Sequence, residues 1–136
     1  MDFMKSIAIA AAGLRAQAGR MHVISENIAN ADSTPSRPGG DPYRRKIATF
    51  QSEMDRALDA RIVALGPVRT DSSDFQVKHE PGHPAADING DVRYPNVNPL
   101  IELTDLREAQ RSYMANINVI SATRAMIVRT LDILKS

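Results

Sequence analysis

Residues 79–83 read HEPGH, a literal match to H-E-x-x-H, the signature in which two histidines bind a catalytic zinc ion. That chemistry needs a helix, because only there do residues i and i+4 project onto one metal ion. Pro81 opposes a helix, and Pro84 pushes His83 toward extended backbone. The only other histidine, His22, lies in a distant segment. We therefore predict a proline-fixed turn here, with a zinc peptidase as an alternative.

No other arrangement of reactive side chains predicts an enzyme. The 136 residues include no cysteine, and they contain neither a nucleophile elbow nor a phosphate-binding glycine loop. The 17 basic and 16 acidic residues are mixed along the chain, so no basic patch favours nucleic acid. No apolar run is long enough to span a membrane. We therefore expect no catalytic residues, no cofactor, no metal, no nucleic-acid partner and no direct insertion into a membrane.

The first thirty residues carry apolar side chains at alternating spacings of four and three, which predicts a helix with an apolar row along it. The row consists of Phe3, Ile7, Ala10, Leu14, Gln17, Met21, Ile24 and Ile28. Residues 7–14 also resemble the apolar core of a signal peptide, but the row continues through the supposed cleavage site. We therefore expect the N-terminus to be retained.

The C-terminal residues repeat this spacing and predict a second long helix, whose start is uncertain by about one turn. Its row consists of Leu103, Leu106, Gln110, Tyr113, Ile117, Ile120, Arg124, Ile127, Leu131 and Leu134. Only three Phe, three Tyr and no Trp are present, so a large core is hard to build. We predict a mainly α fold in which the two terminal helices pair as a coiled coil and complete their burial against other chains.

The residues between the two helices predict loops and short strands. Three prolines and two glycines in residues 31–46 stop any helix. Residues 60–67 and 74–79 predict two strands, with a polar turn between them that would form a β-hairpin. Residues 47–59 fit either a strand or a short helix, and residues 81–99 fit no regular element.

Three regions follow from these patterns. They are an N-terminal helix (1–30), a loop-rich middle region with a short β-hairpin (31–100) and a C-terminal helix (101–136).

Four stretches resemble the rod proteins of the bacterial flagellar basal body, most closely their proximal-rod C type. GLRAQAGRMHVISENIANADSTPS (13–36) resembles the end of the family's first helix, and YRRKIATFQ (43–51) resembles the segment after it. PGHPAADINGDVRYPNVNP (81–99) resembles a Pro-x-His-Pro turn followed by Tyr-Pro-Asn-Val-Asn. EAQRSYMANINVISATRAMIVRTLDIL (108–134) resembles the closing helix. Asp91 departs from the pattern, which carries an aromatic residue there.

The resemblance implies a structural protein that assembles with copies of itself and with other rod proteins into a helical tube that transmits torque. It also implies export without cleavage and a place in the periplasm-spanning rod, with membrane-ring and export-gate proteins as partners at the rod base. The alternative is a cytoplasmic helical adaptor that dimerises.

Two sets of residues are the expected subunit interface. The helix seams are Phe3, Ile7, Leu14, Met21, Ile24, Ile28, Leu106, Tyr113, Ile117, Ile120, Ile127, Leu131 and Leu134. The loop contacts are Asn27, Asn30, Tyr94, Pro95, Asn96 and Asn98, for which helix capping and turn formation are an equal alternative.

Overall fold

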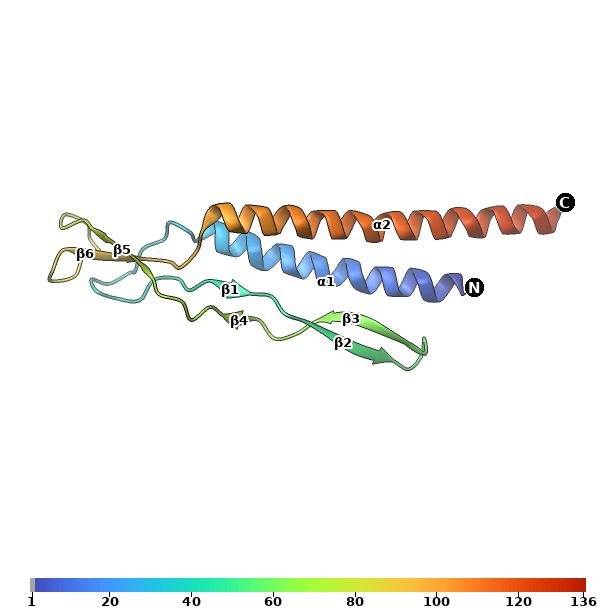
Figure 1. Cartoon of the computed structure of the whole chain (residues 1–136), viewed down its shortest axis with the longest axis horizontal. Coiled ribbons are helices and arrows are strands. Elements are labelled where there is room, and N and C mark those ends of the chain that lie inside the picture. Colours follow the sequence, from blue (N-terminus) through green and yellow to red (C-terminus); the bar gives the residue numbers. More distant parts are fainter. Residues whose placement is uncertain (1) are drawn as a thin grey trace. The chain divides into compact units, whose positions relative to one another are not determined.

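Two helices are the longest elements of the computed structural model, which describes residues 2–136 (Figure 1). Helix α1 spans Phe3–Ala29 and helix α2 spans Pro99–Lys135. No proline interrupts either helix beyond its first residue, and alanine is frequent in α1, so intrinsic propensity agrees with the apolar spacing. The mainly α fold with a helix near each end and a small strand-containing region between them is confirmed.

The chain between the helices forms three antiparallel pairs of strands. The strands are β1 (Lys46–Ile47), β2 (Phe50–Asp55), β3 (Ala60–Leu65), β4 (Arg69–Thr70), β5 (Gln76–His79) and β6 (Asp91–Tyr94). Strand β1 pairs with β4, β2 with β3, and β5 with β6. The β2–β3 hairpin aligns Phe50 with Leu65 and Asp55 with Ala60, and its turn holds Asp59 at a positive φ of 47°.

The predicted partner of the 60–67 strand was wrong. This segment forms β3, but β3 pairs with the preceding β2, and the 74–79 segment forms β5 and pairs with β6. Residues 50–55 adopt the strand conformation that the sequence left open between strand and helix. The expectation of no regular element in residues 81–99 was also wrong, because Asp91–Tyr94 forms β6. Gly90, at a φ of 83°, turns the chain into that strand.

Two compact units divide the chain, and the division crosses both helices. The first unit contains the described residues up to Met21, together with Thr49–Pro67 and Arg107–Ser136. The second contains His22–Ala48 and Val68–Leu106. Each unit therefore holds part of α1, part of α2 and at least one strand pair.

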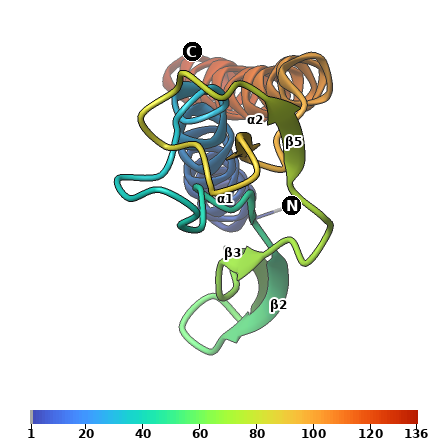
Figure 2. The ribbon, with the colours of Figure 1, turned by 90° about the vertical axis from the view of Figure 1, so that its left-hand side faces the viewer.

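In the first unit, α1 packs against α2 in the antiparallel sense. Gly13 lies so close to Asn116 that a Cβ atom at Gly13 would be 2.8 Å from Asn116 Oδ1. Arg20 forms an ion pair of 3.6 Å with Glu108. From Gly13 to Arg20 the chain advances by seven residues, and from Asn116 to Glu108 it goes back by eight, as expected for antiparallel helices. The β2–β3 hairpin covers another side of α1, where Gly19 faces Leu65 (Figure 2). The core here is built from small side chains such as Ala10, Ala12, Ala16 and Ala109.

In the second unit, the first turn of α2 begins one turn before the apolar row that predicted it. Asn98 caps this turn, because its Oδ1 accepts a hydrogen bond of 3.1 Å from the backbone N–H of Leu100. Pro99 then occupies the first helical position, where its missing N–H costs nothing. Val92, Pro95 and Val97, in the segment that leads into α2, are buried.

Candidate functional site

The HEPGH stretch does not form a zinc-binding helix. His79 is the last residue of β5, and its Nδ1 lies 2.9 Å from Asp91 Oδ1 on the paired strand. The hydroxyl of Tyr94 donates a hydrogen bond of 3.1 Å to Glu80, the residue that would have to activate water in a zinc peptidase. His83 Nδ1 accepts the backbone N–H of Ala85, which closes the proline-rich turn. No cluster of three metal-ligating side chains occurs within residues 2–136.

Asn27 is the centre of a buried polar hub in the second unit. Its side chain is 1% exposed and makes four hydrogen bonds, the full capacity of an amide. The Nδ2 group donates to the carbonyl of Lys46 at 2.8 Å and to Glu102 Oε2 at 3.1 Å. The Oδ1 atom accepts from the backbone N–H of Lys46 at 2.9 Å and from the Tyr43 hydroxyl at 2.8 Å. One side chain of α1 thereby holds both the 43–46 segment and α2.

Arg45 joins the same hub from the opposite side of Glu102. Its Nε donates to Glu102 Oε1, and its terminal nitrogens lie 3.4 Å from Asp71 and 3.7 Å from Asp105. Burial lowers the pKa of Arg45, but hydrogen bonds and charge interactions with Glu102 and Asp71 outweigh burial and raise the pKa overall. Hydrogen bonds from Ser73 are the main cause that holds the pKa of Asp71 below its usual value, and Arg45 adds to this effect.

Glu102 is the group whose placement makes the hub necessary. Its side chain is 0% exposed, and a buried carboxylate without partners would be strongly unfavourable. Asn27 and Arg45 each bond one of its two oxygens, so the charge is both paired and hydrogen-bonded. Burial is the first cause that raises the pKa of Tyr43 to about 12, with the charges of Glu26 and Glu102 adding to it.

The remaining loop residues that the sequence singled out also make bonds within the chain. Asn96 accepts the backbone N–H of Arg45 at 2.8 Å and donates to the carbonyl groups of Asp71 and Ser73. Asn30 donates to the carbonyl of Glu26 at the C-terminal end of α1. Asn98 caps α2, Tyr94 bonds Glu80 and Pro95 is buried. The capping and turn roles are therefore present, and the role of these residues between subunits stays a prediction.

The predicted row on α1 lies along a face that the chain covers only in part. Ile24 is buried, whereas the other predicted seam positions are half-buried. These half-buried positions are Phe3, Ile7, Leu14, Met21 and Ile28.

On α2 the covered row differs in phase from the predicted one. The most covered positions, at alternating spacings of four and three, are Glu102, Leu106, Ala109, Tyr113, Asn116, Ile120, Thr123 and Ile127. Four predicted seam residues lie on this row: Leu106, Tyr113, Ile120 and Ile127. Leu103, Leu131 and Leu134 are exposed, and Ile117 is half-buried beside the row. Along the covered row, polar or small side chains therefore alternate with large ones, while several other large apolar side chains of α2 lie outside it.

The exposed apolar residues of α2 lie on both flanks of the covered row. Val119, Met126 and Ile133 are exposed and follow one another at intervals of seven. Val119 and Met126 each precede a position of the row by one residue, a rotation of 100° about the axis, and Ile133 likewise precedes Leu134, to which the same spacing extends the row. Leu103 and Val128 are exposed and each follows a position of the row by one residue, so they lie on the opposite flank. We call these the leading flank (Val119, Met126, Ile133) and the trailing flank (Leu103, Val128).

Comparisons with known proteins match two regions of the chain to families of flagellar basal body rod proteins. A family of flagella basal body rod proteins matches residues 7–35, and the C-terminal family of the flagellar basal body rod proteins FlgE, FlgF and FlgG matches residues 89–133. The flagellar basal-body rod protein FlgC of Agrobacterium fabrum is 51% identical over 128 residues, covering 94% of this chain and 92% of that protein. This chain belongs to the FlgC family of flagellar basal-body rod proteins.

Two more distant FlgC proteins have the same extent. The Bacillus subtilis protein is 35% identical, with 98% of this chain and 99% of that protein covered. The Salmonella typhimurium protein is 36% identical, with 98% of each covered. As a member of the FlgC family, the chain is a structural subunit of the flagellar basal-body rod and not an enzyme. No helix among residues 2–136 is long and apolar enough to cross a membrane.

The two matched regions of this FlgC-family chain correspond to its helices. Residues 7–35 contain most of α1, and residues 89–133 contain β6 and nearly all of α2. The hub uses Asn27 from the first region and Glu102 from the second, while Arg45 and Asp71 lie between them.

Sequence reasoning singled out Asn27 and missed the other side chains of the hub, which are Tyr43, Arg45, Asp71 and Glu102. One signal was available for Glu102, which is the only charged residue in the apolar run PLIEL at the start of α2. A single carboxylate within an apolar run indicates a side chain that is buried together with the run. A buried carboxylate needs a partner, because burial without one is unfavourable. Nothing in the sequence indicated which cation would pair with it.

Proposed function

We propose that this chain assembles with copies of itself and with other rod proteins into a helical tube that acts as the drive shaft of the flagellum. The tube carries torque from the membrane ring through the periplasm, with membrane-ring and export-gate proteins as neighbours at its base. The chain reaches this place by export without removal of a leader. Residues 1–30 and 101–136 provide the assembling helices, and residues 31–100 provide the connecting region.

The two exposed apolar flanks of α2 are the observation that carries this proposal. Val119 and Met126 on the leading flank, and Leu103 and Val128 on the trailing flank, keep large apolar surfaces in water. Apolar side chains that are exposed together on one face of a protein mark contacts with other proteins. The half-buried seam of α1 adds a further incomplete surface, which includes Leu14 and Met21.

Apolar flanks on opposite sides of one helix favour a polymer over a simple dimer. A single partner helix covers one flank and leaves the other in water. A helix with neighbours on both sides is the arrangement in a wall of packed helices, where contacts of unlike surfaces extend without closing. The cytoplasmic dimerising adaptor is therefore the weaker alternative. Asn27 of the hub, Asn96 and the α2 cap Asn98 would set the shape of the loops that meet neighbours.

The test is the location of the chain in the cell. A tagged copy is expressed in place of the native one, and basal bodies are isolated in detergent. We expect the tag in the rod fraction in amounts that rise and fall with the number of basal bodies. A tag that stays in the cytoplasmic fraction of swimming cells would support the adaptor and contradict the rod assignment.

A further inference from the structure

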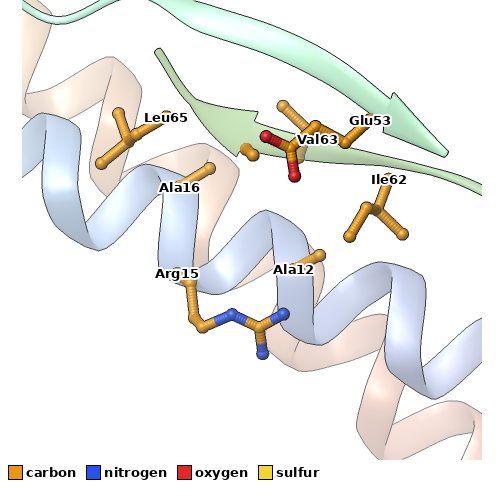
Figure 3. A pocket seen from close by; sticks show the side chains of 8 residues that line it. Ala12, Arg15, Ala16, Glu53, Ile62, Val63 and Leu65 are labelled. Carbon is orange, nitrogen blue, oxygen red and sulfur yellow. The ribbon is translucent and has the colours of Figure 1, made fainter. Parts of the chain in front are cut away.

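A groove in the first unit lies between α1 and the β2–β3 hairpin (Figure 3). Ala12 and Ala16 of α1 form one wall of the groove. The opposite wall is residues 62–65 of β3, which are all aliphatic. Arg15 and Glu53 bring one positive and one negative charge to its edges. The groove has a volume of about 290 Å³, which is small for a drug-sized ligand but sufficient for aliphatic side chains.

The same unit also carries a protruding apolar segment. Ile127 of α2 lies beside Phe3 and Met4 at the start of α1, and α2 continues for two further turns (Figure 1). Leu131 and Leu134 extend the row that faces α1, at the spacings of four and three. No α1 residue remains to cover them, and Leu131 is 50% exposed.

We infer that Leu131 and the last turns of α2 from one copy of the chain occupy the groove of a second copy. This inference rests on the proposed function and names one of the contacts that would build the rod. Leu131 is an aliphatic side chain, which matches the apolar lining of the groove. Ala12 and Ala16 are only 2% and 3% exposed, so the apolar surface that the groove offers to a second copy comes mainly from residues 62–65.

Charges at the two surfaces are complementary. Asp132 follows Leu131 directly, and Lys135 is one turn further on the same side of α2. Asp132 matches Arg15, and Lys135 matches Glu53. None of these four side chains has an ion-pair partner within the part of the chain that the structure describes, and Glu53 accepts only the Gln51 amide at 2.7 Å.

The contact joins two different surfaces of one chain, so it does not close on itself. A projecting apolar segment that fits a groove elsewhere on the same molecule links copies head to tail. Such a contact leaves a free groove at one end of a series and a free α2 segment at the other. This is the property that a growing tube of subunits needs.

The test uses cysteine cross-linking, because the chain contains no cysteine of its own. Two full-length copies with different tags are expressed together, one with Ala64→Cys in the groove and one with Leu131→Cys. Basal bodies are isolated and oxidised, and the linked product is identified by both tags. We expect a disulfide between the two copies, since this bond requires Cα atoms within about 7 Å.

The matched control is Ile133→Cys in place of Leu131→Cys. Ile133 is 74% exposed and lies on the same turns of α2 as Leu131. Because the two residues are two positions apart, their side chains project from different sides of the helix. Because Ile133 lies on the leading flank, the yield is counted per copy incorporated into the rods, and we expect it to be at least fivefold lower with this variant. Equal yields from both positions would overturn the inference, because they would indicate random contact.

The failure of this inference can be separated from failure of the proposed function. Rods that contain both tagged copies but no cross-link, or a link from Leu131→Cys to another rod protein alone, would overturn only the groove contact. Absence of the unmodified chain from the rods would overturn the proposed function itself.

A second measurement covers the case in which the cysteine variants do not enter the rod. Glu53→Lys and Lys135→Glu should each reduce incorporation by about two- to fivefold, the range for loss of an exposed ion pair, and the double variant should restore it. Additive losses in the double variant would overturn the inference.

Discussion

Asn27 Nδ2 donates a hydrogen bond of 3.1 Å to Glu102 Oε2 and so joins the last turns of α1 to the first turn of α2. The other oxygen of Glu102 accepts from Arg45, which lies just after the 31–43 loop. Residues 75 positions apart in the chain are thus fixed by a single buried carboxylate.

Replacement of Asn27 by Ala should destabilise the second unit. The change removes four hydrogen bonds and leaves Glu102 and the backbone N–H of Lys46 short of partners. Each unsatisfied buried group costs about 1–3 kcal/mol, so we expect the free energy of unfolding to fall by ~3 kcal/mol. Urea unfolding followed by circular dichroism measures it. Asn89→Ala in an exposed turn is the control, and a similar small effect for both variants would contradict the role of the hub.

Removal of Arg45 alone should lower the free energy of unfolding more than removal of both Arg45 and Glu102. Arg45→Met leaves the fully buried Glu102 carboxylate without its cation, which costs about 3–5 kcal/mol. Arg45→Met combined with Glu102→Leu removes both charges and should recover most of this loss. A double-mutant cycle of unfolding free energies tests it. A double variant that is no more stable than Arg45→Met would contradict the prediction.

Stability should fall in alkaline solution because of Tyr43. Burial, with Glu26 and Glu102 adding to it, raises the pKa of Tyr43 to about 12 from its ordinary value of 10.0. The protonated phenol is thus favoured by folding, so its contribution is fully present below pH 10 and is lost as the pH rises toward 12. We expect unfolding midpoints to decrease over this window in the wild type, and to decrease less in Tyr43→Phe. Equal decreases in both proteins would show that Tyr43 is not the cause.

A charge on the leading flank should block assembly without unfolding the chain. Met126→Asp places a carboxylate on a surface that is already exposed, so the free energy of unfolding should change by less than about 0.5 kcal/mol. The same carboxylate would be buried against a neighbouring subunit, so incorporation into basal bodies and swimming should be lost.

The control for this variant is Asn118→Asp, an exposed polar position on α2 that lies outside both flanks. It adds the same charge to the same helix and should swim normally. Normal swimming of Met126→Asp would remove the leading flank from the interface.

The two helices could be predicted from the sequence because the evidence for each helix lies within one segment of the chain. A spacing of four and three, frequent alanine and the absence of interior proline are all read within one segment. The hub could not be predicted in this way, because Arg45 and Glu102 are far apart in the chain and only the fold brings them together. The pairing of β3 with β2 depended on residues 50–55, whose mixed polar and apolar order favours no single element.

The phase of α2 was misjudged for a physical reason. Sequence reasoning assigns the largest apolar residues to the covered side, as is correct for a protein that folds alone. Here Leu103 is exposed, while Glu102, Asn116 and Thr123 are covered. A chain that is completed by neighbours need not place its most apolar residues against itself.

The polar side chains of the covered row have a consequence for the order of events in assembly. A buried Glu102 has only one position in which Asn27 and Arg45 can both reach it, so the hub specifies one alignment of α1 with α2. Apolar surfaces alone tolerate many alignments, because the hydrophobic effect has no direction. The hydrogen bonds of the hub can therefore align α1 with α2, while the exposed apolar surfaces stay available for contacts with other subunits. Alignment within a subunit depends on polar contacts, and contact between subunits depends on apolar surfaces. The two therefore do not compete for the same side chains.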